Sequence, residues 1–586
     1  MEVCSNDLVH NASVELTSST FIPVLVASLF VALIGGSPKV RAWIRLGFRM
    51  RREEQENRRD KRPENSHLDA YHDAVVRAHP THRGHLGAVD AGTSEGVQPG
   101  AVNRGVIDER TWADLDLDQV YSKLDHTRSR PGQQYLRHLL RTPALSAEPI
   151  VALNRDVTKL DRDAGGAAGI RKALELCDDR RASSLVKLFY GELPDRPEFW
   201  WVFPLLTISA VVVAAMVSVW PRALLGLLAI ALVNILLQLF YRPHVEALIP
   251  AIHEVPAFLK TAKALATCRT DLFVPERETL SQGTIQLGLM RRATTWLKFE
   301  PSQERNELLA TLYVYTNFLF LLDLNAFVFS IATARRLRPT MQQMFEAIGY
   351  IDATQSIAAW RTTLPHWTAP DFTSAHKEIR MSGIVHPLVK NAVANSLTIK
   401  NSSALITGSN MSGKTTFIRA LGVNAILAQS LGTAVATAWR APMLHVMSSI
   451  GRSDSVLEGK SYYLAEVESI RSLIEQKGDG AQHLFLIDEL FRGTNTSERV
   501  AGAYAVLEYL NRGDDIVVVA THDTELLAML GDAYAPHHFR EQISGDTLSF
   551  DFTLRDGHAT TRNAIALLEL MNYPAEIVLR ARNALT

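Results

Sequence analysis

The longest apolar stretch of the chain runs over residues 199–241 and contains one charged residue, Arg222, next to Pro221. Helices that are apolar on every side are typical of a lipid environment or of a deeply buried core. Trp200, Trp220 and Tyr241 lie near the ends of the two apolar halves, where amphipathic rings favour the headgroup layer. The pattern predicts a transmembrane helical hairpin that turns at Pro221 and Arg222. A buried pair of core helices is the alternative.

A shorter apolar run, residues 20–36, has no charged residue and is just long enough to cross about 30 Å of hydrocarbon. Basic residues dominate the segment that follows it, and such an excess favours the cytoplasmic side of a membrane. The sequence therefore predicts a first transmembrane helix at 20–36, with residues 1–19 outside the cell. The basic segment also fits contact with anionic lipid or with nucleic acid.

Apolar residues recur at helical spacing over residues 111–187 and 245–363, which predicts one helical domain interrupted by the hairpin. The stretch 308–332 is apolar as well, but Asn317, Asp323 and Asn325 would be costly in lipid. A further crossing there would also place the phosphate-binding loop described below outside the cytoplasm. We therefore expect residues 308–332 to be soluble core.

Glycine-rich sequence over residues 81–105 predicts a flexible linker. Five histidines lie in or near it, without the carboxylate or cysteine spacing of a metal site, and are expected to be solvated: His67, His72, His79, His82 and His85.

Length and charge add two limits. The chain has 586 residues, more than one hydrophobic core usually covers, so several domains are expected. Its 61 Lys and Arg residues nearly cancel its 62 Asp and Glu residues, so any basic surface must be local. The three cysteines, Cys4, Cys177 and Cys268, are too far apart in sequence to indicate a zinc site.

An apolar strand over 404–407 leads into a loop that fits GxxxxGK[ST] and then into a helix. In such loops the glycines let backbone N–H groups surround phosphates at a helix N-terminus. The loop residues are Gly408, Ser409, Asn410, Met411, Ser412, Gly413, Lys414, Thr415 and Thr416. Lys414 is expected to meet the β and γ oxygens of ATP, and Thr415 to bind Mg²⁺.

Two further apolar strands end in polar side chains. Residues 484–487 precede Asp488 and Glu489, and residues 517–520 precede Thr521 and His522. We expect Asp488 to complete the Mg²⁺ shell with Thr415, and Glu489 to act as the general base for the attacking water. His522 is expected near the γ-phosphate, because strand ends of a parallel sheet converge on one edge. Lys414, Glu489 and His522 are thus the predicted catalytic residues.

These motifs resemble the MutS-type ATPases of mismatch repair. The loop matches G-x-N-M-x-G-K-[ST]; Asp454, Gly459, Ser461, Tyr463 and Glu466 match D-x-x-x-x-G-x-S-x-[FY]-x-x-E; and residues 488–496 match D-E-x-x-R-G-T-x-T. The A-T-H-x-x-E-L run at 520–526, the His386-Pro387 pair, the core-like segment 124–143 and the closing segment 573–585 extend the likeness.

The resemblance implies an α/β P-loop NTPase domain of MutS type, preceded by an all-α core. It also implies a dimer in which Gly459 and Ser461 complete the partner's nucleotide site. Arg492, Gly493, Thr494 and Thr496 would form the dimer-facing loop.

Two departures from the family qualify this reading. No mismatch-reading domain with its Phe-x-Glu motif is recognisable, since the only such triplet is Phe539-Arg540-Glu541. The aromatic residue that stacks on adenine after His-Pro has no counterpart, so Val393 or a neighbour would have to replace it.

The expected order of segments is an extracytoplasmic N-terminus (1–19), a transmembrane helix (20–36), a basic segment and linker (37–107), a helical core (108–198), the hairpin (199–241), more helical core (242–380) and the ATPase domain (381–586). The predicted function is a multi-pass, membrane-anchored ATPase that uses ATP and Mg²⁺, with its ATPase domain in the cytoplasm. The expected partners are a second copy of the chain, membrane lipid, DNA without mismatch reading, and an unidentified protein. The alternatives are a membrane protein or scaffold without a DNA role, and a transporter-type ATPase.

Overall fold

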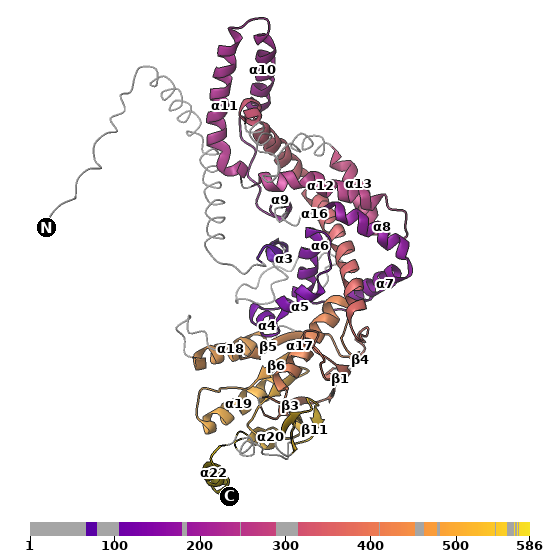
Figure 1. Cartoon of the computed structure of the whole chain (residues 1–586), viewed down its shortest axis with the longest axis vertical. Coiled ribbons are helices and arrows are strands. Elements are labelled where there is room, and N and C mark those ends of the chain that lie inside the picture. Colours follow the sequence, from indigo (N-terminus) through magenta and orange to yellow (C-terminus); the bar gives the residue numbers. More distant parts are fainter. Residues whose placement is uncertain are drawn as a thin grey trace, which may run out of the picture. The chain divides into compact units, whose positions relative to one another are not determined.

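A computed structural model describes residues 66–78, 105–177, 185–246, 248–288, 315–374, 376–409, 411–451, 462–477, 481–544, 547–558 and 573–585, together with Leu568 and Met571 (Figure 1). The chain divides into two compact units. The hairpin unit takes the described residues of Arg181–Lys260 and Gln282–Gln343. The sheet unit takes His67–Arg180, Thr261–Ser281 and Met344–Thr586. The predicted helix at 20–36 and the basic segment that follows it lie outside the described residues.

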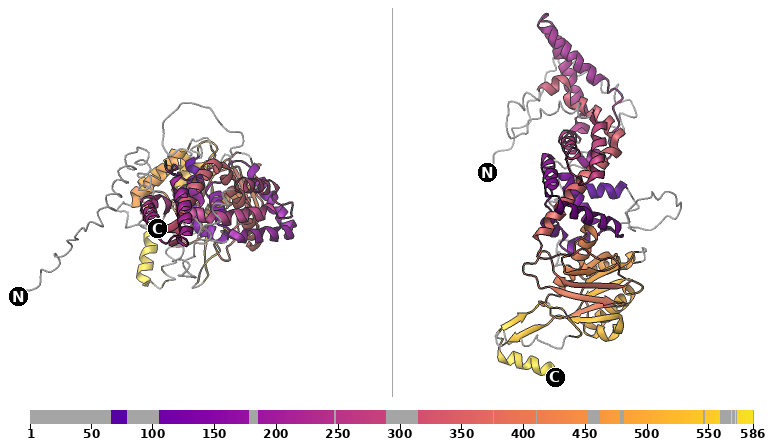
Figure 2. Two further views of the ribbon diagram at one scale, coloured as in Figure 1. Left: turned by 90° about the horizontal axis from the view of Figure 1, so that it is seen from above. Right: turned by 90° about the vertical axis from the view of Figure 1, so that its right-hand side faces the viewer.

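The sheet unit is built on a six-stranded mixed sheet with the order β11-β8-β3-β7-β6-β5 (Figure 2, right). The strands from β8 to β5 run parallel, and only β11 is antiparallel. Their bounds are β3 (Ser403–Thr407), β5 (His445–Ile450), β6 (His483–Asp488), β7 (Ile516–Ala520), β8 (Tyr534–His538) and β11 (Arg555–Asp556). Strands β3, β6 and β7 are buried at every position, as their unbroken apolar sequences require in a sheet covered on both faces. The predicted α/β P-loop domain is confirmed.

Helices cover both faces of this sheet. Helix α17 (Lys414–Leu431) shares one core with Leu484, Leu486 and Val518, whereas α18 (Tyr462–Gln476), α19 (Thr496–Leu510) and α20 (Glu525–Leu530) share another with Phe485 and Val517. Successive residues of a strand point to opposite faces, so neighbouring positions in β6 and β7 feed different cores. The 3₁₀ turn η5 (Gly531–Ala533) follows α20.

Smaller elements complete the C-terminal half. An antiparallel sheet with the order β2-β1-β4 consists of β1 (Glu378–Ile384), β2 (Asn395–Lys400) and β4 (Ala438–Arg440). Strands β9 (Glu541–Ser544) and β10 (Thr547–Phe550) pair as a hairpin, and α22 (Ala575–Leu585) ends the described chain.

The helical part of the sheet unit begins with α3 (Ser66–Ala78) and continues through α4 (Glu109–Asp114), α5 (Leu117–Leu124), α6 (Arg130–Arg141), α7 (Glu148–Arg162), α8 (Ala164–Leu174) and the 3₁₀ turn η2 (Glu175–Cys177). Side-chain caps start several of these helices: Asp108 accepts from Thr111 N, and Ser129 accepts from Gly132 N. Three further helices contribute residues to both units: α12 (Ile249–Ala266), α13 (Val274–Gln286) and α16 (Leu322–Thr363). The predicted helical region before the ATPase domain is confirmed.

Buried polar contacts join this helical part to the sheet. Strand β5 lies at one edge, where unpaired backbone groups need partners. Thr111 Oγ1 of α4 accepts a hydrogen bond from Ser448 N at 2.9 Å, and Asp114 Oδ2 accepts from Ile450 N at 2.9 Å and from Ser448 Oγ at 2.8 Å. Helix α4 therefore covers the sheet edge, so the helical segment and the ATPase sheet fold as one body.

Residues 66–78, within the segment 37–107 that was predicted as basic segment and linker, form helix α3. Asp69 binds the buried guanidinium groups of Arg137 and Arg141, with nearest N–O distances of 2.6 and 3.0 Å. His72 is buried rather than solvated, and its Nδ1 lies 3.2 Å from His138 Nδ1. Burial lowers the pKa of His72 to about 4, so the helix docks with a neutral imidazole at this position. His79, His82 and His85 lie outside the described residues.

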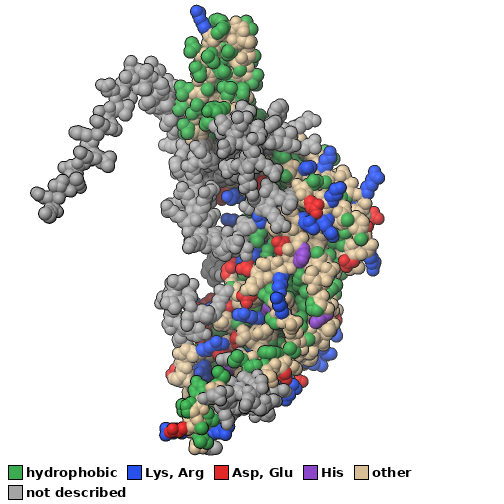
Figure 3. Space-filling model, viewed as in Figure 1, with side chains coloured by type: hydrophobic (Ala, Val, Ile, Leu, Met, Phe, Trp, Pro, Cys, Tyr) green, Lys and Arg blue, Asp and Glu red, His purple; other side chains and the backbone are tan. Residues whose placement is uncertain are grey.

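The hairpin unit contains α9 (Leu185–Phe189) and two antiparallel helices, α10 (Val202–Val217) and α11 (Ala223–Glu246), which turn at residues 218–222 as predicted (Figure 1). Hydrophobic side chains dominate the visible surface of this hairpin (Figure 3). Exposed examples are Ile208, Val212, Val219, Leu225 and Leu228. Only Ala223–Tyr241 is long and apolar enough to cross a membrane among the helices described, because α10 is shorter. The expectation of several spanning helices is therefore not supported.

Candidate nucleotide site

Three parallel strand ends meet at one edge of the six-stranded sheet. Strand β3 ends at Thr407 before the phosphate-type loop, β6 ends at Asp488, and β7 ends at Ala520 just before Thr521 and His522. Strands β3, β7 and β6 are direct neighbours, so the loops after them lie side by side. The carboxyl edge of an open parallel sheet is where such folds bind ligands.

The loop at 408–413 is shaped by two glycines. Gly408 has φ +140° and Gly413 has φ +105°, conformations that other residues rarely adopt. A Cβ at Gly408 would also lie only 2.8 Å from Phe539 O. Met411 is exposed and Ser412 is buried, with its Oγ donating to Ser409 O at 2.7 Å. Asn410 lies outside the described residues.

Lys414, the first residue of α17, folds back over this loop. Its Nζ donates to Gly408 O at 2.5 Å and to Ser409 O at 2.8 Å. The Ser409 Oγ is buried and has no hydrogen-bond partner in the described part of the chain. Burial lowers the pKa of Lys414 from 10.5 to about 8, and the nearby carboxylates of Glu489 and Asp488 oppose this shift. The loop thus holds a cation and an unsatisfied hydroxyl, both suited to phosphate oxygens.

Thr415 and Asp488 are brought together as predicted. Thr415 Oγ1 donates to Asp488 Oδ2 at 2.6 Å, and Asp488 is buried at the end of β6. A hydroxyl and a carboxylate at this separation are oxygen donors of the kind that Mg²⁺ prefers.

Glu489 is held by partners on two sides. His522 Nε2 lies 2.7 Å from its Oε1, and Arg492 Nε lies 2.5 Å from its Oε2. Its backbone N–H donates to Ala520 O at 2.8 Å, and its φ is +61°. Burial pushes the pKa of Glu489 up, but the hydrogen bond with His522 and the charge of Arg492 outweigh it, so the net pKa is lowered. The carboxylate is therefore ionised at neutral pH, as a base must be.

Helix α18 holds the loop after Glu489 through hydrogen bonds to its backbone. Glu466 accepts hydrogen bonds from Phe491 N at 2.5 Å and from Arg492 N at 3.1 Å. The predicted dimer-facing residues Arg492, Gly493 and Thr496 are exposed, and Thr494 is partly exposed. Gly459 and Ser461, predicted to complete a partner's site, lie outside the described residues.

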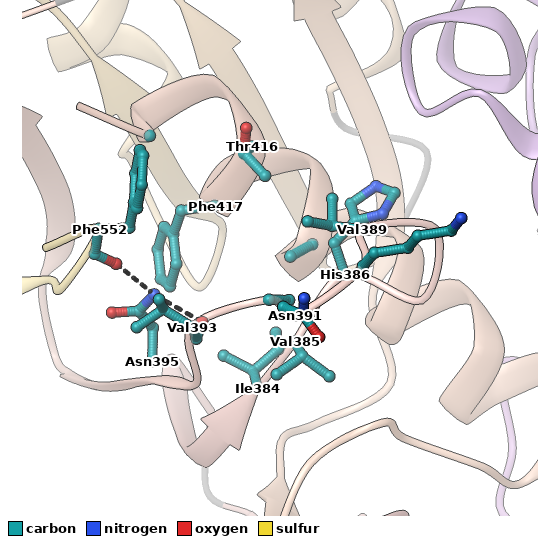
Figure 4. A pocket seen from close by; sticks show the side chains of 14 residues that line it. Ile384, Val385, His386, Val389, Asn391, Val393, Asn395, Thr416, Phe417 and Phe552 are labelled. Atoms are coloured by element: carbon teal, nitrogen blue, oxygen red, sulfur yellow. Dashed lines mark hydrogen bonds between the residues drawn. The ribbon is translucent and has the colours of Figure 1, made fainter. Parts of the chain in front are cut away.

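A pocket of about 260 Å³ opens beside Gly413 and Thr416 (Figure 4). Val385, His386, Val389 and Val393 line it from the segment between β1 and β2, and Phe417 and Phe552 line it from α17 and from the chain after β10. Asn395 ties these parts together, donating to Phe552 O at 3.0 Å and accepting from Leu554 N at 2.7 Å. The pocket is mostly apolar and adjoins the phosphate-type loop.

The part of the chain that carries this geometry matches a known protein family in sequence. The MutS domain V family matches residues 404–586, which include all three strand ends. Residues 404–586 thus form a domain of the MutS domain V family.

Two curated relatives agree with this assignment. The DNA mismatch repair protein MutS of Petrotoga mobilis is 28% identical over 256 residues, and the DNA mismatch repair protein MutS 2 of Halobacterium salinarum is 31% identical over 259 residues. Each match covers 42% of this chain but only 31% and 29% of the respective relative. The chain thus spans less than a third of the length of either relative.

The MutS-type site includes one aromatic residue that sequence reasoning missed. Phe552 is 159 residues beyond Val393, and no motif marks it. Its φ is +52°, and its ring lies near Gly413, where an added Cβ would meet Phe552 Cδ1 at 3.3 Å. The alternation of Phe550, the last residue of β10, and Phe552 is the sequence signal that could have indicated it. The two rings stack with centroids 5.9 Å apart. Phe552 thus supplies an aromatic face that Val393 cannot.

The pKa of Lys414 predicts how ATP affinity changes with pH. Only the ammonium form attracts phosphate, and in the free protein it loses its proton as the pH rises through about 8. The dissociation constant for ATP should therefore stay flat below pH 8 and rise by up to about tenfold per pH unit above it. Binding titrations from pH 6.5 to 9.5 measure this. Lys414→Arg keeps its charge over this range and should give a flat profile; a flat profile for the unmodified chain would contradict the assignment.

Phe552 should contribute to binding of the base and not of the phosphates. Loss of an aromatic stacking partner costs roughly 1–3 kcal/mol per base, so Phe552→Ala should weaken ATP binding about fivefold or more. Tripolyphosphate, which has no base, should bind the variant and the unmodified chain equally well. Competition titrations with both ligands test this. Equal weakening for ATP and tripolyphosphate would show that the substitution acts on the loop instead.

Proposed function

We propose that the chain is an ATPase of MutS type that binds ATP and Mg²⁺, hydrolyses ATP, works as a dimer and is attached to a membrane by its helical hairpin. The observation that carries the catalytic part is the ionised Glu489 carboxylate between His522 and Arg492, next to the Thr415 and Asp488 pair. A nucleotide-binding scaffold would not need this arrangement.

The chain's own residues fit a bound nucleotide. Lys414 Nζ would leave its carbonyl partners in the loop and bind phosphate oxygens. Ser409 Oγ, which has no partner among the described residues, would donate to phosphate as well, and the glycine loop would supply backbone N–H groups. Thr415 and Asp488 would hold Mg²⁺, which neutralises charge that develops on the phosphates. The pocket between Val393 and Phe552 is the place for the adenine.

Glu489 is the group that would orient and deprotonate the attacking water. Its two partners fix its direction: His522 holds one oxygen and Arg492 the other. For Glu489 to accept a proton, one of these contacts must lengthen, and Arg492 stands on the exposed loop proposed to face the partner subunit. Dimer contact at Arg492, Gly493, Thr494 and Thr496 would then influence the base directly. Gly459 and Ser461 are proposed to complete the partner's site.

Membrane attachment rests on the apolar surface of α10 and α11. Exposed Val, Leu and Ile side chains surround both helices, and no charged residue lies between Phe199 and Tyr241 except Arg222 at the turn. A surface of this kind in water would promote association, whereas in lipid it is favourable. We propose a multi-pass membrane protein with its N-terminus outside and its ATPase domain in the cytoplasm. The positions of residues 1–36 belong to this proposal.

DNA is proposed as a second partner because both relatives are named DNA mismatch repair proteins. No mismatch-reading segment is recognised in this chain, so any DNA contact should be insensitive to mismatches. Output to an unidentified protein partner or to the membrane itself remains the alternative use of the same ATPase.

ATP turnover of the detergent-purified chain tests the proposal. Glu489→Gln should lower kcat by about a hundredfold or more and leave ATP binding intact, because only the proton acceptor is lost. Glu508→Gln, which removes a surface carboxylate paired with Arg512, is the matched control and should keep full activity.

The same assay is run with homoduplex and mismatched DNA. Stimulation by both duplexes to the same extent would support a DNA role without mismatch reading; no stimulation would place the output at the membrane or a protein. Full turnover by Glu489→Gln would contradict the assigned base.

A further inference from the structure

The apolar segment that begins at residue 315 is interrupted at Leu321. Residues 315–320 are helical, Leu321 has φ +50°, and α16 begins at Leu322. Leu321 is fully buried, within a core that also contains Phe203 of α10, Leu237 and Tyr241 of α11, and Phe327 of α16. The left-handed conformation costs free energy for a leucine, so the surrounding core must hold Leu321 in it and thereby interrupt the helix.

Side chains of the hairpin helices satisfy the backbone groups at this break. Asn234 Nδ2 donates to Leu319 O, Gln238 Nε2 donates to Asn317 O, and Thr207 Oγ1 donates to Phe320 O, each at 2.7 Å. Asn234 is fully buried although it lies within an otherwise apolar helix. The side-chain donors of these three hairpin residues thus bind carbonyl groups of the broken segment.

Three polar residues of the segment itself, Asn317, Asp323 and Asn325, also make hydrogen bonds within the protein. Asn317 Nδ2 donates to Asp323 Oδ2 at 2.6 Å, and Asp323 N donates to Asn317 Oδ1 at 3.0 Å. Asn325 Nδ2 donates to Leu321 O at 3.0 Å and to Thr207 Oγ1 at 2.9 Å. These are the three residues whose cost in lipid led us to expect soluble core here. The hydrogen bonds of Asn317 with Asp323, and of Asn325 Nδ2 with Leu321 and Thr207, lower that cost, although Asn325 Oδ1 has no partner among the described residues.

The contacts also give the depth and direction of the segment. Asn234 lies about 10 Å along α11 from Tyr241, at about 1.5 Å per residue, so Leu319 reaches that far into the apolar hairpin. After the break the chain returns toward the hairpin's base. Phe329 meets Trp200 with ring centroids 6.4 Å apart, and Arg335 then pairs with Asp195 at 2.6 Å.

We propose that residues 315–331 enter the bilayer with the hairpin as a re-entrant element, going in through 315–320, turning at Leu321 and leaving along α16. The proposal rests on the membrane attachment proposed above. In lipid every backbone polar group needs a partner within the protein, and non-helical backbone at membrane depth occurs where protein surrounds it. Thr207, Asn234 and Gln238 supply that protein shell. A re-entrant element adds no crossing, so the sheet unit keeps the cytoplasmic side.

Lipid quenching of a fluorescent probe tests this in the full chain reconstituted into phosphatidylcholine vesicles. Cys4, Cys177 and Cys268 are replaced by serine, and one cysteine is introduced for the probe. Phe318→Cys reports on the broken segment, Val212→Cys on the exposed face of α10, and Met529→Cys on the sheet unit. Lipids brominated on their acyl chains quench only probes that lie in the hydrocarbon.

We expect the probe at 318 to be quenched to an extent comparable with that at 212, while the probe at 529 is unaffected. Quenching at 212 with none at 318 would overturn the re-entrant element and leave the membrane hairpin standing. Absence of quenching at both positions would overturn the membrane attachment as well, so the two failures are distinguishable.

Asn234→Leu supplies an independent test of the proposed pairing. Made in the Phe318→Cys background, it keeps the size of the side chain but removes the donor to Leu319 O. The break should therefore loosen, and the introduced thiol should react several-fold faster with a water-soluble maleimide. Val233→Leu, on the exposed side of the same helix, is the matched control and should leave the rate unchanged. Equal rates in Asn234→Leu and the parent would contradict the role of Asn234.

Discussion

Burial of helix α17 is the constraint on which the sheet unit depends. The helix carries the phosphate-type loop at its N-terminus and is buried almost continuously from Phe417 to Leu431. At its C-terminus the buried Arg361 of α16 donates to the carbonyls of Leu431 and Gly432, both at 3.0 Å. A cation at the carbonyl end of a helix is favourable, and here it also joins α16 to the helix that holds the nucleotide loop.

Other side chains along α17 also bind neighbouring segments. Arg419 pairs with Asp116 at 2.9 Å, Asn424 donates to Val385 O at 3.0 Å, and Gln429 donates to Ala144 O at 3.1 Å. Asp116 and Ala144 belong to the helical part of the sheet unit, and Val385 lines the pocket beside Gly413 and Thr416. A close-packed interior does not deform smoothly, so a shift of the loop on ATP binding would move these neighbours together.

The loop that follows β6, unlike α17, has a strained backbone and few contacts. Glu489 and Phe491 both have φ near +60°, which costs of order 1–3 kcal/mol for each residue. Glu466 and His522 hold this loop in place, and the exposed Arg492 completes the arrangement. Strain held by a few named contacts next to an exposed loop is suited to a site that responds to a partner subunit.

The strands of the ATPase domain and the residues at their ends could be predicted from sequence. Strands such as 484–487 and 517–520 are unbroken apolar runs, and the polar residues that follow them lie at one edge of a parallel sheet whatever the conformation of the loops. Contacts between distant segments could not be predicted in this way. Phe552 reaches the base pocket through a left-handed backbone, and α3 docks through Asp69 and His72 although the surrounding sequence is that of a linker. The break at Leu321 is likewise invisible in composition, because polar residues look costly in lipid until their partners are known.

The chain carries a MutS-type ATPase domain and an apolar hairpin that we propose to lie in lipid, and flotation tests this proposal most directly. A chain beginning at Ser66 keeps the hairpin and the ATPase domain and omits the segment at 20–36. Mixed with lipid vesicles and centrifuged through a density gradient, it should float, carry its ATP hydrolysis into the lipid fraction and resist extraction at high pH. ATPase activity that stays in the dense, lipid-free fraction would contradict the account.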